Sequence, residues 1–321
     1  MAVYTEVADD ELEAFVSAYD IGSVHSFKGI AEGVENSNFL LRTERASFIL
    51  TLYEKRVEEN DLPFFIGLLE HLSAHGVICP QPVRNRTGRA LGRLAGKPAA
   101  LVTFLEGVSI KRPDARHCGM VGEALGSLHK AGAAFASTRA NALSFRGWLS
   151  LFRSVEARAH EVQEGLAPML TQEIAHLYNN WPKALPSGII HGDLFPDNVF
   201  FLGGKLSGLI DFYFACNDFH AFDLAICLNA WCFEPDASFN ITKGMALING
   251  YERVRRLSAQ EAEALPILAR GAAVRFLLTR LADWLNRVEG ALVRPKDPME
   301  YVKKLGFHQQ ASSARDYGLL R

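Results

Sequence analysis

The chain has 321 residues, of which 49 % are hydrophobic and 22 % are charged, and its net charge is −2. This composition is ordinary for a globular protein, and it excludes a disordered chain, a collagen-like repeat and a small disulfide-rich scaffold. The length suggests about two domains. With 34 basic against 36 acidic residues, the chain has no overall positive field that would hold a nucleic acid or an anionic membrane, so we expect neither as a partner.

The N-terminal segment and the cysteines indicate a cytoplasmic protein. Residues 1–15 are acidic and lack the basic region and apolar stretch of a secretory signal. No uncharged apolar run of 18 residues predicts a transmembrane helix. The five cysteines are an odd number without a CxxC pair, so we expect reduced thiols in the core. The sequence does not indicate an oligomeric state.

The first 105 residues predict a β-rich lobe with one main helix. Runs of β-branched and aromatic residues predict strands, and apolar residues at a spacing of three and four predict the helix, which Gly76 would end. In chain order we expect paired strands over 37–43 and 47–53, a helix over 58–75, a hairpin around 85–92 and a buried strand over 98–105.

Helical spacing dominates beyond Gly107. We expect helices over 114–135, 146–163 and 166–181, short strands and loops over 187–211, and mostly helices from His220 onward. Ser258 and Glu261 form a capping box that opens one helix, and Pro266 suits the first turn of the next. The chain is therefore predicted to be an α+β protein of two lobes, residues 1–105 and 106–321, with a cleft between them for a small molecule.

One stretch carries the residues most suited to chemistry. His191-x-Asp193 is followed by Asn198, and Asp211 comes thirteen residues after Asn198. Between them, an apolar strand, a Gly-Gly turn and a returning strand favour a hairpin, whose open end would bring Asn198 and Asp211 together. Two carboxylates and an amide around one point suit Mg²⁺ with substrate phosphates, which is the set of groups that phosphoryl transfer requires. Alternatively, these residues are only turn formers with local backbone bonds.

Longer motifs around these residues resemble the kinase-like phosphotransferases of small molecules, the aminoglycoside phosphotransferase and choline kinase superfamily. Within it they look like the bacterial homoserine kinases, over nearly the whole chain. The motifs are GVENSNF (33–39), ILTLYE (49–54), LPFFIGLLEHL (62–72), GKPAALVTFLEG (96–107), HGDLFPDNVFF (191–201), LSGLIDFYFACND (206–218) and FDLAICLNAWCFE (222–234). The resemblance implies a bilobal protein-kinase-like fold with a β-rich N-terminal lobe and a larger, mostly helical C-terminal lobe, and ATP and Mg²⁺ as cofactors.

The resemblance also implies roles for single residues. Asp193 would orient or deprotonate the acceptor hydroxyl, and Asn198 and Asp211 would bind one or two magnesium ions. His191 and Asp223 would support the loop that carries Asp193. From the residues alone, His191 is also interpreted as structural rather than as a general base.

The nucleotide would bind to the N-terminal lobe. The residues implied are Gly29, Gly33, Asn36, Thr103 and Leu105, from a glycine-containing turn and from the segment that connects the lobes. The two glycines could instead mark an ordinary turn. Members of the superfamily usually have a basic residue on the strand after the phosphate loop, but this sequence has Thr51 there, and Lys55 and Arg56 follow the strand.

The implied reaction is ATP-dependent phosphorylation of the hydroxyl of L-homoserine to O-phospho-L-homoserine, a step in threonine biosynthesis. Such a site needs an acid near the ammonium group and a cation near the carboxylate. The candidates are Asn229, Trp231, Glu234, Arg275 and Arg280. The two arginines are about 140° apart around a helix. Alternatively, Trp231 is a core residue, and Arg280 forms an ion pair with Asp283 and does not bind the substrate. Choline, ethanolamine, a methylthio-sugar or an aminoglycoside are alternative acceptors, and a non-catalytic pseudokinase is a further alternative.

Overall fold

The computed structural model describes residues 5–30, 36–54, 58–287 and 295–320. The chain forms two compact units, one of residues 1–107 with 207–213, the other of residues 108–206 with 214–321. The segment 207–213 therefore belongs with the N-terminal residues, whereas the sequence analysis assigns it to the stretch 106–321. Hydrogen bonds from Leu209 N to Ile78 O (2.9 Å) and from Ser207 Oγ to Glu106 O (2.7 Å) attach it there.

The first unit is built around a five-stranded antiparallel sheet in the order β1-β2-β3-β5-β4. The strands are β1 (Val24–Gly29), β2 (Ser37–Thr43), β3 (Ser47–Leu52), β4 (Leu91–Leu94) and β5 (Lys97–Thr103). The hairpin predicted from 37–43 and 47–53 is confirmed, with Phe39 opposite Leu50. Its alternate side chains face one core, since Phe39, Leu41 and Leu50 are all buried.

The hairpin predicted around 85–92 was wrong. β4 and β5 form the hairpin, and they turn at Ala95 and Gly96, both of which have positive φ angles (48° and 72°). The Asn85 side chain instead closes a separate turn by accepting hydrogen bonds from the backbone N–H groups of Thr87 and Arg89. Asn, Gly and Arg in that stretch thus give a local turn without paired strands on either side.

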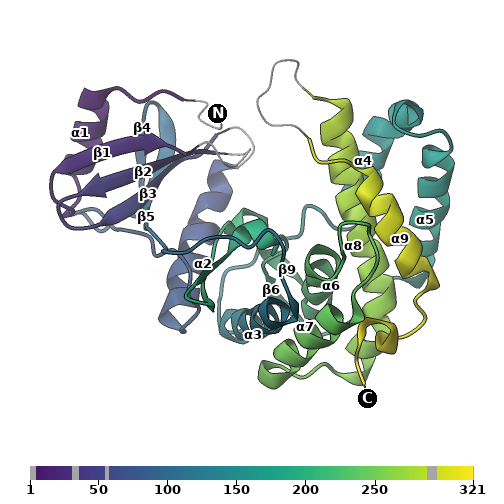
Figure 1. Ribbon diagram of the computed structural model, residues 1–321. Helices are drawn as coiled ribbons and strands as arrows, with labels where there is room; N and C mark the ends of the chain where they lie inside the picture. The colour runs from purple at the N-terminus through teal and green to yellow at the C-terminus, as the bar shows by residue number, and fades with distance from the viewer. Residues whose placement is uncertain (1–4, 31–35, 55–57, 288–294, 321) are drawn as a thin grey trace. The chain divides into compact units, whose positions relative to one another are not determined.

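Helices α1 (Asp9–Ser17) and α2 (Leu62–Ala74) complete the first unit (Figure 1). Leu12 and Phe15 of α1 belong to one buried cluster with the apolar residues of the sheet. α2 begins later than predicted, after a 3-10 turn at Glu59–Asp61, and it stops before Gly76, whose φ of +84° only glycine adopts easily.

The second unit is mainly helical (Figure 1). Its helices are α3 (Ala115–Gly132), α4 (Phe145–Val155), α5 (Leu166–Asn180), α6 (His220–Trp231), α7 (Ile241–Val254), α8 (Ala259–Leu285) and α9 (Met299–Gln310). Two small sheets accompany them: β6 (Ser187–Ile190) pairs antiparallel with β9 (Cys216–Phe219), and β7 (Val199–Leu202) pairs with β8 (Lys205–Leu209), which ends in the first unit. Further 3-10 helices are Glu156–Glu161, Pro196–Asn198, Phe212–Phe214 and Ala314–Tyr317.

Glycines let α3 and α7 pack backbone against backbone. A Cβ atom on Gly122 would overlap the carbonyl oxygen of Leu247, and one on Gly250 would overlap that of Gly119. Larger residues at these positions would push the helices apart. This close packing brings the C-terminal half of α3 next to α7, which matters for the site described below.

Helix α8 is one continuous helix, so the break predicted at Pro266 was wrong. The capping box of Ser258 and Glu261 starts it as predicted, but Pro266 lies inside it. A proline inside a helix removes one hydrogen bond and costs about 3 kcal/mol. Leu265, Leu268 and Ala269 on either side of the proline are completely buried, and α8 packs against α6. This burial offsets the missing hydrogen bond.

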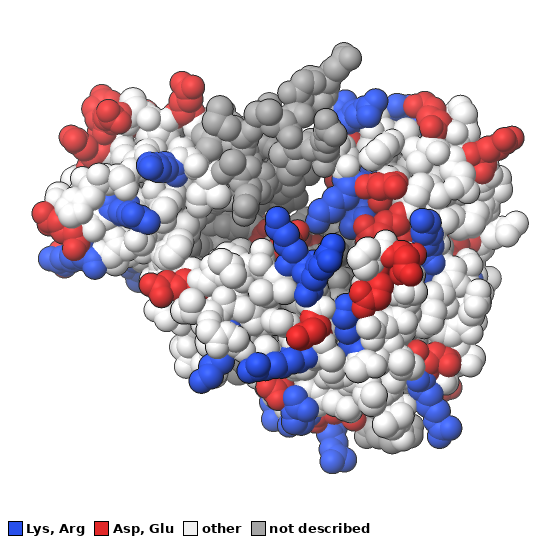
Figure 2. Space-filling model, in the orientation of Figure 1, with Lys and Arg blue, Asp and Glu red and all other residues white. Residues whose placement is uncertain are grey.

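All five cysteines are buried and none forms a disulfide, in agreement with the expected core thiols. Within the described residues, no helix has both the length and the apolar character needed to cross a bilayer. On the face shown in Figure 2, basic and acidic side chains lie next to one another over the helical unit. Ion pairs such as Arg253–Glu123 (2.6 Å) and Arg280–Glu300 (2.6 Å) follow the same pattern.

Two buried histidines in the second unit are held in the neutral form. His308 on α9 hydrogen-bonds the Tyr317 hydroxyl (2.9 Å) and the Asn229 side-chain oxygen (3.0 Å). Asn229 donates its own amide hydrogens to Ala225 O and Ala269 O, so its oxygen accepts from His308 Nε2. Burial lowers the pKa of His308 to about 3, and it lowers the pKa of His220 to about 3 as well.

These pKa values predict acid sensitivity. Both histidines have folded-state pKa values below the ordinary 6.5, so the unfolded chain binds more protons below pH 6.5, and stability falls as the pH falls. From pH 6 to pH 5 the two groups should remove about 2 kcal/mol of the free energy of unfolding. Urea unfolding at both pH values measures this. In His308→Gln the loss should shrink by about 1 kcal/mol, whereas His176→Gln, exposed on α5, serves as the control. An unchanged pH dependence in His308→Gln would contradict the neutral buried histidine.

Candidate active site

The central loop of the site, residues 191–198, follows β6 directly. We call it the catalytic loop, after the catalytic role that the sequence analysis predicts for Asp193. Its start requires glycine, because Gly192 has a φ of +75° and a Cβ there would lie 2.9 Å from the Phe214 carbonyl oxygen. The loop ends in a 3-10 turn at Pro196–Asn198, which leads into β7. Gly192 thus allows the chain to turn sharply from β6 and present the side chain of Asp193.

Asp223, near the N-terminus of α6, holds the start of the catalytic loop. Its carboxylate accepts hydrogen bonds from the backbone N–H groups of His191 (2.7 Å) and Gly192 (2.9 Å). Asp223 and His191 are both completely buried. Hydrogen bonds to an ionised group are stronger than neutral ones, and two of them on consecutive amides fix both position and direction. The role implied for Asp223, support of the loop, has this geometric basis.

A third hydrogen bond to Asp223 comes from His129 on α3, whose Nε2 lies 3.1 Å from Asp223 Oδ2. The other ring nitrogen of His129 lies 2.8 Å from the Tyr251 hydroxyl, which in turn accepts a hydrogen bond from Arg255 (3.1 Å). An ionised carboxylate only accepts, so His129 donates from Nε2 to Asp223, and Nδ1 of the neutral ring then accepts from the Tyr251 hydroxyl. Arg255 in turn forms an ion pair with the capping residue Glu261 (2.9 Å).

These hydrogen bonds and the burial of both groups determine the charges of Asp223 and His129. Burial alone would raise the pKa of Asp223, but its hydrogen bond to His129 and the surrounding donors lower that pKa below the usual value. Burial lowers the pKa of His129. At neutral pH the pair is therefore a carboxylate and a neutral imidazole, and the negative charge of Asp223 is compensated by donated hydrogen bonds.

Asp193 and Asn198 lie together on the catalytic loop. The side-chain amide of Asn198 donates to the backbone oxygen of Asp193 (2.8 Å) and to its Oδ2 (3.2 Å). The backbone N–H of Asp193 lies 3.3 Å from His191 Nδ1, which gives His191 a structural role in the loop. Among the described residues the Asn198 side-chain oxygen accepts no hydrogen bond, so it is available to a ligand.

The middle of the loop is anchored to α6. Trp231 Nε1 donates to the backbone oxygen of Leu194 (2.7 Å), and both residues are buried. Cys227 Sγ contacts the same oxygen (3.9 Å). Trp231 was predicted as a substrate residue with the core as the alternative, and the structure shows it in the core, supporting the loop.

Asp211 belongs to the first unit and follows β8. It has a φ of +64°, a conformation that costs a residue with a Cβ atom about 1 kcal/mol and that occurs often at functional sites. Its side chain is exposed to solvent, yet the surrounding protein hinders hydration of the carboxyl group and raises its pKa to about 6. A bound cation would favour the ionised form.

Hydroxyl groups occupy the position where the superfamily usually has a basic residue. Thr51 is buried on β3, and its hydroxyl donates to the Asn38 side-chain oxygen (2.8 Å). The Tyr213 hydroxyl, two residues after Asp211, interacts with the hydroxyls of Thr51 and Tyr53. Burial raises the pKa of Tyr213 well above its usual value, so this layer carries no charge at neutral pH.

The predicted nucleotide-binding residues all belong to the first unit, and one of them, Gly33, lies outside the described residues. Gly29 is the last residue of β1, and buried Asn36 accepts a hydrogen bond from Glu54 N (3.3 Å). Thr103 ends β5 and bonds Gln81 through its backbone and its hydroxyl. Leu105 packs on Gly208, where a Cβ would lie 2.5 Å from Leu105 Cδ1.

Three predicted acceptor-site residues have their polar groups occupied by other parts of the protein. Asn229 is completely buried and uses both ends of its amide in the bonds described above. Glu234 pairs with Lys243 (2.7 Å) and accepts from Asn240 (2.8 Å). Arg280 pairs with Glu300 on α9 rather than with Asp283.

Arg275 differs from these three. It is 2 % exposed, and among the described residues it forms no hydrogen bond and no ion pair. Arg275 and Arg280 lie on different sides of α8, as their spacing in the sequence predicts. Their guanidinium groups therefore have different neighbours. Arg275 is thus the candidate whose binding capacity the protein itself leaves unused.

Sequence reasoning missed His129, Tyr251 and Tyr213. His129 and Tyr251 are each single polar residues on otherwise apolar helix faces, and no local pattern marks them. For Tyr213, the one sequence signal was its position in the motif around Asp211.

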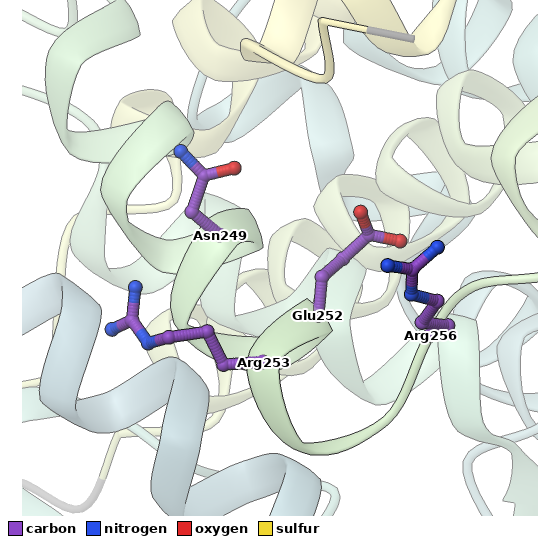
Figure 3. Close-up of a pocket in the computed structure, with 4 residues that line it drawn as sticks. All are labelled: Asn249, Glu252, Arg253 and Arg256. Carbon is purple, nitrogen blue, oxygen red and sulfur yellow. The ribbon is translucent and has the colours of Figure 1, made fainter.

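A surface pocket at the end of α7 is separate from these residues (Figure 3). Asn249, Glu252, Arg253 and Arg256 line it. Arg253 pairs with Glu123 (2.6 Å), and the Glu252 carboxylate accepts from Leu257 N (3.1 Å). None of its lining residues belongs to the catalytic loop or to the residues predicted for the site.

Comparison with known sequences covers the full chain. Residues 26–257 match the phosphotransferase enzyme family. The chain is 66 % identical over 319 residues to homoserine kinase of Xanthobacter autotrophicus, covering 99 % of both chains. It is 65 % identical to homoserine kinase of Bradyrhizobium diazoefficiens, covering 100 % of this chain and 98 % of that one.

Solved structures show the same fold at low sequence identity. An amicoumacin kinase, hAmiN, superimposes with a TM-score of 0.69 at 13 % identity and covers 94 % of this chain and 92 % of its own. Choline kinase from Cryptosporidium parvum gives a TM-score of 0.68 at 14 % identity, with 94 % and 95 % coverage. These similarities confirm the predicted α+β, protein-kinase-like fold.

The role of Asp223 can be tested by Asp223→Asn. Asparagine can accept from only one of the two backbone N–H groups, and its own NH₂ would face a second donor. We expect the free energy of unfolding to fall by about 2–3 kcal/mol. The amides of His191 and Gly192 should also exchange faster with D₂O. Asp197→Asn is the matched control, because Asp197 lies in the same loop but is exposed, and its ion pair among the described residues is with Lys296 (3.3 Å). Unchanged protection of both amides in Asp223→Asn would refute the anchoring role.

Proposed function

Since the chain belongs to the phosphotransferase enzyme family, we propose that it transfers the γ-phosphoryl group of ATP to the hydroxyl of L-homoserine. The products are O-phospho-L-homoserine, an intermediate of threonine biosynthesis, and ADP. The observation that carries the proposal is the anchored catalytic loop, in a chain that matches homoserine kinases from end to end. The five free thiols suit a reducing compartment, and the cytoplasm is the proposed location.

Asp193 is the proposed catalytic residue. Its carboxylate accepts a hydrogen bond from the acceptor hydroxyl and receives that proton as the new O–P bond forms and the bond between the γ-phosphorus and ADP breaks. Asn198 Nδ2 donates to Asp193 Oδ2 and thereby fixes the rotation of the carboxylate. The backbone bonds of the loop to Asp223 hold the main chain of this residue in place.

Asn198 and Asp211 are the proposed magnesium ligands. Their donor set fits, because Mg²⁺ takes hard oxygen ligands and uses few from the protein when phosphates are present. Asn198 has an amide oxygen that accepts no hydrogen bond from the residues the structure describes, and Asp211 offers a carboxylate held in an uncommon backbone conformation. When bound, the ion supplies positive charge that neutralises the phosphate oxygens.

The first unit is the proposed site of the nucleotide, with Gly29, Gly33, Asn36, Thr103 and Leu105 as the residues implied. Thr103 ends β5 and Leu105 follows it, and backbone groups there are suited to an adenine ring. Because Thr51 and Tyr213 form a neutral layer, contacts to the phosphates would depend on backbone N–H groups and on magnesium rather than on a lysine of β3.

The choice of acceptor can be tested directly. Purified protein with MgATP is offered L-homoserine, choline, ethanolamine and an aminoglycoside in parallel, and ADP release is measured. We expect turnover with L-homoserine, at a kcat/KM at least about 100-fold above that for the others, since a site that pairs with a substrate's charged groups rejects acceptors lacking them. A preference for another alcohol would replace the substrate, and ATP binding without turnover of any acceptor would favour a pseudokinase.

Asp193→Asn tests the catalytic role. Asparagine keeps the shape but cannot take the proton, so kcat should fall by about 10³-fold or more, within the range that general base catalysis supplies. The Kd for ATP, measured by titration calorimetry, should change less than about threefold, because the proposed nucleotide residues are elsewhere. Asp197→Asn again provides the control. Wild-type turnover in Asp193→Asn would exclude Asp193 as the base.

A further inference from the structure

Arg275 on α8 is a buried cation whose charge no direct contact neutralises. Only 2 % of its surface is exposed, and Nε is completely buried without a hydrogen-bond partner. Its two terminal nitrogens form no hydrogen bond and no ion pair among the described residues either. Burying a guanidinium without hydrogen-bond partners destabilises the folded protein. The stability of the free protein therefore does not explain an arginine at this position.

Aromatic rings surround this guanidinium and connect it to the catalytic loop. Its carbon Cζ lies 4.7 Å from the ring centre of Phe276 and 5.8 Å from that of Phe214. The Phe276 ring packs against Phe195 of the catalytic loop (4.8 Å), two residues after Asp193. On another side the same ring stacks on Tyr301 of α9 (5.5 Å). The rings keep the guanidinium in place without using its N–H groups.

Tyr301 provides a second unused donor. It is completely buried, and its hydroxyl has no hydrogen-bond partner in the described part of the chain. The ring is fixed by Arg280 (4.5 Å) and Lys304 (4.7 Å), which lie against it. The hydroxyl group interacts electrostatically with Arg280 and Glu300, and more weakly with Asp193 and Arg275. Two buried donors without partners therefore lie in the surroundings of the proposed catalytic residue.

Neighbouring carboxylates do not account for Arg275. Asp193, Asp218 and Asp223 all interact with it electrostatically, but none forms an ion pair with it. Asp223 is occupied by His191, Gly192 and His129, and Asp218 accepts from Asn141 Nδ2 (2.6 Å) and Phe219 N (2.7 Å). Burial lowers the pKa of Arg275, but the ordinary pKa of arginine is so high that it stays charged.

We propose that Arg275, assisted by the Tyr301 hydroxyl, binds the carboxylate of the acceptor amino acid and so determines that the acceptor is an amino acid rather than a simple amino alcohol. This inference rests on the proposed function. A carboxylate matches the planar fork of a guanidinium, and a tyrosine hydroxyl can donate a third hydrogen bond. Because choline and ethanolamine lack a carboxylate, they would leave both donors unpaired, which disfavours them.

The decisive comparison uses two acceptors that differ only in this group, L-homoserine and 3-amino-1-propanol. The kcat/KM of each is measured for the wild type and for Arg275→Met. The wild type should prefer L-homoserine, and in Arg275→Met this preference should fall about 100-fold, the loss typical of removing one partner of a buried charge pair. Arg275→Lys keeps the charge without the fork and should lose about 10-fold. Tyr301→Phe, which loses only a hydroxyl, should also lose about 10-fold.

Arg270→Met is the matched control, since Arg270 lies on the same helix but already pairs with Glu173. Its preference for L-homoserine should stay within threefold of the wild type. If Arg280→Met, at the other predicted arginine, loses the preference and Arg275→Met keeps it, the assignment is overturned in favour of Arg280. If Arg275 only stabilises the fold, kcat/KM falls in the same proportion for both acceptors. If it only stabilises the charge of Asp193, the pH profile of kcat/KM shifts for both acceptors. In either case the ratio of the two kcat/KM values is unchanged. That result would overturn the proposal as well.

The outcomes also separate this inference from the proposed function. A wild type that phosphorylates L-homoserine poorly and another alcohol well contradicts the proposed function. A wild type that prefers L-homoserine, with a preference that survives in Arg275→Met, contradicts only the role of Arg275. Should Arg275→Met fail to fold, as judged by circular dichroism, the ratios of Arg275→Lys and Tyr301→Phe decide, because both keep most of the buried volume.

Discussion

The structure of the site depends on one buried carboxylate. Asp223 has no exposed surface, and it accepts hydrogen bonds from two consecutive backbone N–H groups and from His129. A buried negative charge is tolerated only with such compensation, so the catalytic loop has one favourable position. The donors come from the loop and from α3, while Asp223 itself is on α6. The same interaction therefore fixes the main chain that carries Asp193 and joins two helices to it.

The constraint extends outward from Asp223 through neutral groups. The hydrogen bond from Tyr251 to His129 Nδ1 favours the tautomer that donates from Nε2 to Asp223, and Tyr251 is oriented by Arg255, which pairs with Glu261 at the start of α8. The close glycine packing of α3 on α7 makes the first of these contacts possible. Asn198 completes the arrangement at the other end of the loop. The main chain of the catalytic loop is thus held by Asp223 and its partners, which are not among the residues proposed to react or to bind magnesium.

The sequence predicted the elements with strong local patterns. The hairpin of β2 and β3, the apolar face of α2 and the capping box of α8 follow from spacing within a few residues, and the structure confirms them. The hairpin near residue 90 failed because the Asn85 side chain closes a local turn there, while the strands pair across Ala95 and Gly96. The break at Pro266 failed because burial of the neighbouring residues keeps α8 continuous. His129 had no local signal, since its partner Asp223 is 94 residues away in the chain. Arg275 and Arg280 could not be told apart for the same reason, because the partner of Arg280 comes from α9.

The polar groups of the second unit differ in whether their hydrogen-bonding capacity is already used within the protein. Asn229, Glu234 and Arg280 already make strong internal hydrogen bonds or ion pairs, so a ligand that used them would first have to break those contacts. Arg275 Nε and the Tyr301 hydroxyl are unsatisfied, and the free protein bears that cost. In the proposed complex, an acceptor carboxylate that accepts from both residues removes this cost on binding, and its affinity gains accordingly. The proposed selectivity thus rests on donors that folding leaves unpaired, whereas groups that folding pairs, Asp223 and Trp231, hold the catalytic loop in position.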